Sequence, residues 1–136
     1  MTAGYSGTPL VKKLGIKSGQ RLIILGAPDG YDHMLGDLPD RIEIAGELTG
    51  TFDFIHLFTT ERGELESRFP DLKRALAHDG TLWLSWPKKS AKITTDLDEN
   101  IIRAIGLANG LVDVKVAAVD ERWSALKFVY RIKDRR

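Results

Sequence analysis

Short apolar runs alternate along the chain with segments in which apolar residues recur at helical spacing. Three runs are strongly apolar and are bounded by glycine, proline or polar residues: 21–25, 52–58 and 81–86. Short continuous runs of this kind are typical of strands in the middle of a sheet that helices cover on both sides. A weaker run at 41–44 predicts one further strand.

Helices are predicted between these strands. Short ones are expected after Pro9, ending at Gly15, and over about 31–35. A longer helical stretch between residues 60 and 78 contains Pro70, which predicts two helical pieces because proline removes a hydrogen bond and clashes with the previous turn. The apolar stripe of this stretch consists of Leu65, Phe69, Leu72 and Leu76.

The last third of the chain predicts one amphipathic helix and a hairpin. Thr95 and Asp98 have the spacing of a capping box, and the helix that follows ends at Asn109-Gly110. Two strands over about 112–119 and 124–131 are joined by a short charged segment.

Strands that alternate with helices predict a mainly parallel sheet, to which the final hairpin adds antiparallel strands. A chain of 136 residues has the usual size of one domain, and no repeat or long linker divides it. We therefore predict a single α/β domain over residues 1–136, three-layered and doubly wound, with helices on both faces of the sheet.

Composition changes this picture little but excludes several functions. Lys plus Arg (20) nearly balances Asp plus Glu (19), so the net charge of +1 predicts neither nucleic acid nor a membrane as partner. The absence of cysteine excludes disulfides, thiolate nucleophiles and zinc–cysteine sites. No signal-peptide pattern opens the chain, and no apolar segment approaches the ~20 residues of a membrane span. A cytoplasmic location is therefore expected.

The turn after the first strand, residues 26–30, is the first candidate ligand site. A glycine-rich turn from strand to helix exposes backbone N–H groups to a phosphate or nucleoside. Gly26 and Gly30 match the outer positions of a Gly-x-Gly-x-Gly pattern, but Pro28 occupies the middle one and removes a donor. Asp29 places negative charge near any phosphate. Two interpretations stay open: an altered ligand cradle, and the tight connection that such a sheet needs in any case.

An acidic residue near the end of the second strand would be the usual partner of a ribose. Glu43 and Glu47 are the options, and Glu47 is better placed if the strand ends near Ala45. An exposed glutamate without a ligand is the common alternative.

The segment 85–89 follows the third strong strand, at the edge of a parallel sheet where ligands bind. Trp86 offers a stacking face, and Lys88 and Lys89 offer positive charge to an anionic group. The alternative is a solvated loop whose Trp packs its base. Ser85 lacks the flanking glycines of a nucleophile elbow. The candidate ligand-binding residues are thus Gly26, Pro28, Asp29, Gly30, Glu47, Ser85, Trp86, Lys88 and Lys89.

No catalytic residue set and no metal site is predicted. His56 lies within an apolar strand, on the same face as Phe54 and Phe58, which indicates a hydrogen-bonded core histidine rather than a general base. His33 and His78 have no metal-ligand spacing with any carboxylate.

From Phe52 onward, the order of elements resembles the second half of class I S-adenosylmethionine-dependent methyltransferases. Residues 52–57 look like their fourth strand, 72–82 like their next helix, turn and fifth strand, and the final hairpin like their reversed seventh strand between the fifth and sixth. Over its full length the chain resembles a bacterial family of domains of unknown function. The residues that carry this second resemblance are 5–10, 85–89, 112–116 and 123–128.

Departures from the methyltransferase pattern also carry information. About 26 residues separate the first strong strand from Phe52, too few for two complete strand–helix units. The Asp/Asn-Pro-Pro-Tyr motif of amine methylation has no counterpart at 58–61. The resemblance therefore implies a Rossmann-like, methyltransferase-like fold from which one strand and one helix are missing on the cofactor side.

The leading hypothesis is a methyltransferase-like domain that does not catalyse transfer and binds a small ligand or a protein, with S-adenosylmethionine a disfavoured cofactor. One alternative is a minimal methyltransferase with a cofactor site at Gly26, Gly30 and Glu47 and with Lys88 near the substrate. Another is a nucleotide or phosphate binder that uses the turn with Lys88 and Lys89. Truncation would leave the strand edge near 42–44 uncovered, so a homodimer is a further expectation.

Overall fold

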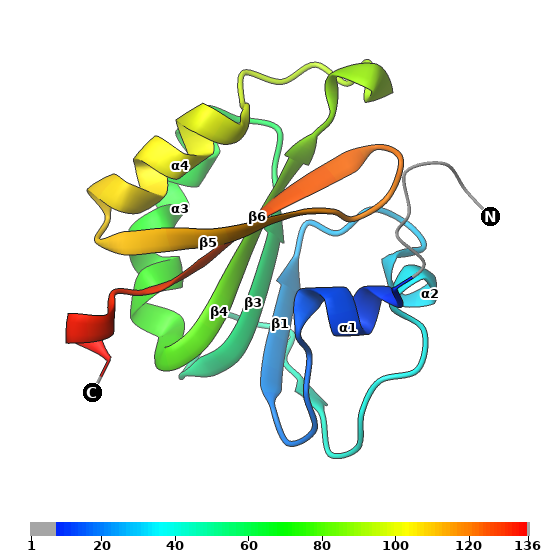
Figure 1. The fold of residues 1–136 in the computed structure, drawn as a ribbon, viewed down its shortest axis with the longest axis vertical. Coiled ribbons are helices and arrows are strands. Elements are labelled where there is room, and N and C mark those ends of the chain that lie inside the picture. The colour runs from blue at the N-terminus through cyan, green and yellow to red at the C-terminus, as the bar shows by residue number, and fades with distance from the viewer. Residues whose placement is uncertain (1–7, 136) are drawn as a thin grey trace.

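A six-stranded sheet with helices on both faces forms the domain (Figure 1). The computed structural model describes residues 8–135; the first part of the 5–10 segment lies outside them. The elements in chain order are α1 (Leu10–Leu14), β1 (Arg21–Leu25), α2 (Tyr31–Leu35), β2 (Glu43–Ile44), β3 (Phe52–Phe58), α3 (Arg62–Ala75), β4 (Leu76–Pro87), η1 (Lys89–Ala91), α4 (Glu99–Ala108), β5 (Leu111–Ala118), β6 (Trp123–Tyr130) and η2 (Ile132–Asp134).

The strand order is β2-β1-β3-β4-β6-β5. Strands β2, β1, β3 and β4 run parallel, whereas β6 pairs antiparallel with both β4 and β5. The predicted mainly parallel α/β sheet with an antiparallel C-terminal hairpin is therefore confirmed. Between β1 and β3 the chain forms only the five-residue α2 and the two-residue β2, so the predicted truncation on this side is confirmed too.

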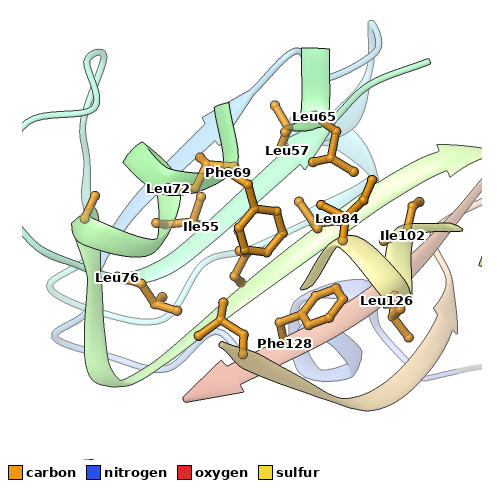
Figure 2. Packing of buried hydrophobic residues seen from close by; sticks show 14 of the residues in the cluster. Ile55, Leu57, Leu65, Phe69, Leu72, Leu76, Leu84, Ile102, Leu126 and Phe128 are labelled. Atoms are coloured by element: carbon orange, nitrogen blue, oxygen red, sulfur yellow. The ribbon is translucent and has the colours of Figure 1, made fainter. Parts of the chain in front are cut away.

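Helices α3 and α4 cover one face of the sheet, where the larger core lies (Figure 2). Phe69 of α3 meets Phe128 of β6 edge to face, with ring centres 6.1 Å apart. Gly106 lies where α4 crosses Phe128, because a Cβ there would collide with the Phe128 ring. Labelled in Figure 2 around this pair are Ile55, Leu57, Leu65, Leu72, Leu76, Leu84, Ile102 and Leu126.

Helices α1 and α2 cover the opposite face. Trp83 of β4 is fully buried there, and its indole Nε1 donates a hydrogen bond to the carbonyl of Leu14 at the end of α1. This bond fixes α1 against the centre of the sheet. Within the described residues, no helix is long and apolar enough to cross a membrane.

The α3–β4 region differs from the sequence prediction. Pro70 lies inside one continuous α3, so the prediction of two helical pieces is wrong. Pro70 is exposed, and water can hydrate the carbonyl that its missing N–H leaves unpaired. Leu76 is not helical but begins β4, where it pairs with Phe52. Residues 78–80 belong to the same strand.

The capping box predicted ahead of α4 is also wrong. Asp98 is itself the N-cap, and its carboxylate accepts a hydrogen bond from the Ile101 N–H at 2.8 Å. Thr95 instead donates its hydroxyl to the carbonyl of Thr60, at 2.7 Å. Asp and Thr are both favoured N-cap residues, so the sequence alone does not show which of the two caps the helix. In the structure Asp98 is the cap, and α4 begins directly after it.

Candidate functional site

The turn after β1 contains two left-handed glycines with different structural roles. Gly26 has φ +69°, and a Cβ at this position would lie 2.6 Å from the Phe58 carbonyl oxygen. Close packing of the turn against the end of β3 therefore accounts for this glycine. Gly30 has φ +86° and precedes α2, with open space where a Cβ would stand. Its left-handed backbone, rather than crowding, accounts for the second glycine.

A hollow of about 480 Å³ lies beside this turn, and we call it the β1–α2 hollow. Its volume falls within the range of small-molecule sites. The wall is mainly apolar; Asp29 and Asp32 are its charged residues, and neither lysine nor arginine lines it. The lining residues are Ile24, Ala27, Pro28, Asp29, Gly30, Tyr31, Asp32, Leu35, Gly36, Leu38 and Ile44.

Only some of the predicted site residues meet at this hollow. Pro28, Asp29 and Gly30 line it, whereas Gly26 packs behind it on β3. Glu47 is exposed in the loop after β2 and is not part of the lining. Ile44 of β2, which was not a candidate, closes one side and is 56% exposed.

The predicted 85–89 segment lies elsewhere and is tied to the β5–β6 hairpin. Trp86 is 7% exposed and belongs to the core under α3 and α4, so it packs the base of the loop. The Lys88 backbone N–H donates to the carbonyl of Arg122, and its Nζ to the carbonyl of Asp120, both at 2.8 Å. Lys89 is exposed in η1.

Ser85 takes part in a buried chain of hydrogen bonds whose members the sequence pattern alone does not connect. His56 Nε2 lies 2.6 Å from Ser85 Oγ, and His56 Nδ1 lies 2.7 Å from Tyr31 Oη. His56 and Ser85 are fully buried, and Tyr31 nearly so. We call these three residues the Tyr31–His56–Ser85 chain. The predicted core histidine is confirmed.

Burial sets the protonation of this chain. It lowers the pKa of His56 to about 3 and raises the pKa of Tyr31, so the imidazole and the phenol are both neutral near pH 7. The ring of Phe58 stacks on His56 with centres 4.2 Å apart and excludes water from one side. Serine, histidine and tyrosine in this order resemble a nucleophile, base and orienting group, but Ser85 has no exposed surface from which to reach a substrate.

The Tyr31–His56–Ser85 chain helps to fix the shape of the β1–α2 hollow. Tyr31 is the first residue of α2 and lines the hollow, while His56 and Ser85 lie in β3 and β4. The two hydrogen bonds thus hold one wall of the hollow against the centre of the sheet. The alternation of residues along β3 indicates which face of the sheet His56 lies on, but not its partner. The partner follows from the register of β3 and β4, which places Ser85 opposite Phe58, two residues along from His56 on the same face. Within residues 8–135, no group of three or more His, Asp or Glu side chains could hold a metal ion.

Solved structures of similar fold include methyltransferases that use S-adenosylmethionine. Magnesium protoporphyrin IX methyltransferase from Synechocystis PCC 6803, with bound SAM, matches with a TM-score of 0.58 over 90% of this chain and 74% of that chain, at 13% identity. A SAM-dependent methyltransferase from Aquifex aeolicus matches with 0.59 over 88% and 86%, at 18% identity. DhpI in complex with SAH matches with 0.62 over 91% and 83%, at 12% identity.

This likeness shows a methyltransferase-like Rossmann fold. No protein-family profile matches the sequence, and no curated protein sequence matches it. The fold is thus the property that this protein shares with them.

Proposed function

We propose that this protein is a minimal S-adenosylmethionine-dependent methyltransferase whose cofactor occupies the β1–α2 hollow. The observation that carries the proposal is the position of the hollow: it adjoins the turn at the carboxyl end of β1, the edge of an α/β sheet where ligands bind. Structures of the same fold with bound SAM or SAH support this assignment over a domain without catalytic activity.

The lining residues fit this cofactor class. Asp29 and Asp32 offer carboxylates that can accept hydrogen bonds from ribose hydroxyls and attract a cationic sulfonium or ammonium group. Leu35, Leu38 and Ile44 offer an apolar wall to a purine ring. The same two carboxylates repel phosphate, and no lysine or arginine of the lining compensates them, which argues against a nucleotide or phosphate ligand.

The chemistry asks little of the protein side chains. When bound, the sulfonium supplies a methyl group that is already activated for displacement. The contribution of this chain would be proximity and orientation, which can supply a large share of the acceleration of a two-substrate reaction. An acceptor that is already nucleophilic, such as a neutral amine, would attack unaided and release its proton to water, so for that class no acid or base at the hollow is required. The rigid Tyr31 wall, held by His56, is the positioning element that the structure offers.

Thermal unfolding in the presence of SAM, SAH, ATP and inorganic phosphate tests the cofactor class. A ligand at about 100 times its Kd adds about 2.7 kcal/mol to the free energy of unfolding. We expect SAM and SAH to raise the Tm and phosphate to leave it unchanged. Asp29→Lys should abolish the shift, whereas the matched charge reversal Asp37→Lys, also exposed but outside the lining, should preserve it.

Two results would overturn the proposal at different steps. If neither SAM nor SAH changes the Tm of the wild-type protein, the hollow is not a SAM site. If both bind but no SAH forms from SAM in the presence of a cell extract as methyl acceptor, the domain binds the cofactor without transfer. The second result would restore the hypothesis of a small-ligand binding module, which the short 26–51 interval favours.

A further inference from the structure

Lysines from three separate elements gather on the face of the sheet that α1 covers. Lys12 and Lys13 of α1 share a hollow of about 380 Å³ with Lys115 of β5. Lys13 Nζ donates a hydrogen bond to the Ala118 carbonyl of β5 at 3.2 Å.

Lys127 of β6 lies opposite Lys115 in the strand register, with its Nζ 6.0 Å from the centre of the Trp83 ring. With Lys17, which follows α1, we call these five residues the lysine patch.

Within the part of the chain that the structure describes, no lysine of this patch forms an ion pair. The ion pairs within residues 8–135 all join arginine to Asp or Glu, and none includes a lysine. Partial burial, and then the charges of Lys115 and Lys17, lower the pKa of Lys127. These ammonium groups therefore repel one another. Such repulsion opposes folding, and a bound polyanion would relieve it.

We infer that the lysine patch docks on the phosphate backbone of double-helical nucleic acid. Lysine ammonium groups act as point charges on phosphates, and their contacts release counterions without reading sequence. The inference departs from the expectation drawn from net charge. A net charge of +1 does not show how charges are distributed over the surface. Glu66 of α3 and Glu99 of α4 pair with arginines of the same helices, whereas these lysines lie together.

The surroundings of the patch favour a duplex over a single strand or a membrane surface. Every Trp and Phe in the described residues is buried, so no such ring is available to stack on unpaired bases. Apolar exposure near the patch comes from Val114 and Val116, whereas membrane-surface binding relies on larger groups such as Trp, Phe and Leu. The phosphates of a continuous duplex therefore match the patch better than either of these alternatives.

This inference is independent of the proposed cofactor. The β1–α2 hollow is built from β1, α2 and β2, and the patch from α1, β5 and β6. The sheet order places β2-β1 and β6-β5 at opposite ends. Failure of one assignment therefore leaves the other standing.

Fluorescence anisotropy with a labelled 20-base-pair DNA duplex tests the inference, with an RNA duplex of the same length as a second arm. At 50 mM salt we expect saturable binding to at least one duplex. With four to five phosphate contacts, raising the salt to 200 mM should weaken binding by about 150- to 500-fold. A single strand of the same sequence should bind more weakly than the duplex.

Charge reversal locates the surface. Lys12→Glu combined with Lys115→Glu should weaken duplex binding at least tenfold, and both side chains are exposed, so the fold should tolerate the changes. The matched control, Lys92→Glu with Lys133→Glu, makes the same change in net charge at exposed positions outside the patch and should stay within about threefold of wild type. If the reversal pair fails to fold, Lys12→Gln with Lys115→Gln replaces it, with an expected loss of about three- to tenfold.

Three outcomes would overturn the inference. The first is no change in anisotropy with either duplex up to 100 times the concentration of the labelled probe at 50 mM salt. The second is an equal loss of binding in the control pair, which would indicate net charge rather than a surface. The third is sedimentation with phosphatidylserine vesicles but no binding to a duplex, which would make the patch a membrane-binding surface.

Discussion

The imidazole of His56 and the hydroxyl of Ser85 lie 2.6 Å apart across neighbouring strands, with no solvent-exposed surface on either residue. The second ring nitrogen of His56 meets the hydroxyl of Tyr31 at 2.7 Å. Every polar atom of the imidazole is thus satisfied inside the protein, and the first turn of α2 is attached to the middle of the sheet. The Tyr31–His56–Ser85 chain therefore contributes to the stability of the protein and to the shape of the β1–α2 hollow.

Ser85→Ala should lower the free energy of unfolding by about 1–3 kcal/mol, because one nitrogen of the buried His56 loses its partner. Urea denaturation followed by tryptophan fluorescence measures the change. Ser90→Ala, at an exposed position in η1, is the control and should alter stability by less than about 0.5 kcal/mol. Equal midpoints for the two variants would contradict a structural role for the hydrogen bond.

The protein should lose stability as the pH falls from about 6 towards 3. Burial holds the pKa of His56 at about 3, whereas the unfolded chain takes up a proton near the ordinary value of 6.5. Between these values the unfolded state binds more protons, so stability rises with pH and falls on acidification, by up to about 1.4 kcal/mol per pH unit. Urea midpoints measured from pH 7 to pH 4 follow this change.

The control for the pH dependence is His56→Gln, which keeps a hydrogen-bonding side chain but cannot titrate. Its free energy of unfolding at pH 7 should be lower than that of the wild type, and its slope between pH 6 and 4 should be shallower. Parallel slopes for the two proteins would show that other groups, and not His56, govern acid unfolding.

Much of the fold could be predicted from the sequence because local signals and tertiary packing agree there. The apolar runs at 21–25 and 52–58 are the observed β1 and β3, and the hairpin strands lie within one residue of prediction. Predictions were wrong where local chemistry was ambiguous. Pro70 is accommodated in one helix because it faces solvent, and residues 76–80 join β4 because Leu76 can pair with Phe52.

The candidate site was predicted only in part, because it depends on register and on charge segregation in space. Pro28 and Asp29 line the hollow as their position after β1 indicated, but the partnership of His56 with Ser85 requires the alignment of two strands. The lysine patch joins residues more than 100 positions apart, such as Lys13 and Lys115. Net charge and linear spacing do not identify which residues are partners in either arrangement.

Gly26→Ala should destabilise the protein more than Gly30→Ala. Both glycines have positive φ, so each alanine adds backbone strain of about 1 kcal/mol. At Gly26 the new Cβ would also lie 2.6 Å from the Phe58 carbonyl oxygen, which forces the turn away from β3. Thermal unfolding of the two variants should therefore show the larger loss of Tm for Gly26→Ala. Equal losses would mean that backbone strain alone explains the glycine at position 26 and that the turn can shift away from β3 without cost.

A second pair of glycines separates packing from helix propensity. Gly63 and Gly106 both lie in helices, where alanine is intrinsically better than glycine by about 1 kcal/mol. A Cβ added at Gly63 would meet no atom within 4 Å, so Gly63→Ala should stabilise the protein by up to that amount. At Gly106 the Cβ would collide with the fully buried Phe128 ring, and overpacking of this kind costs about 1–3 kcal/mol.

Gly106→Ala should therefore destabilise the protein despite the gain in helix propensity. Chemical denaturation of the two variants should give midpoints on opposite sides of the wild-type value. Truncation of the opposing ring in the double variant Gly106→Ala/Phe128→Leu should cost less than the sum of the two single changes, because the leucine leaves room for the new methyl group. Additive losses would show that α4 does not rest on Phe128 through Gly106, and the close approach of this helix to β6 would then need another explanation.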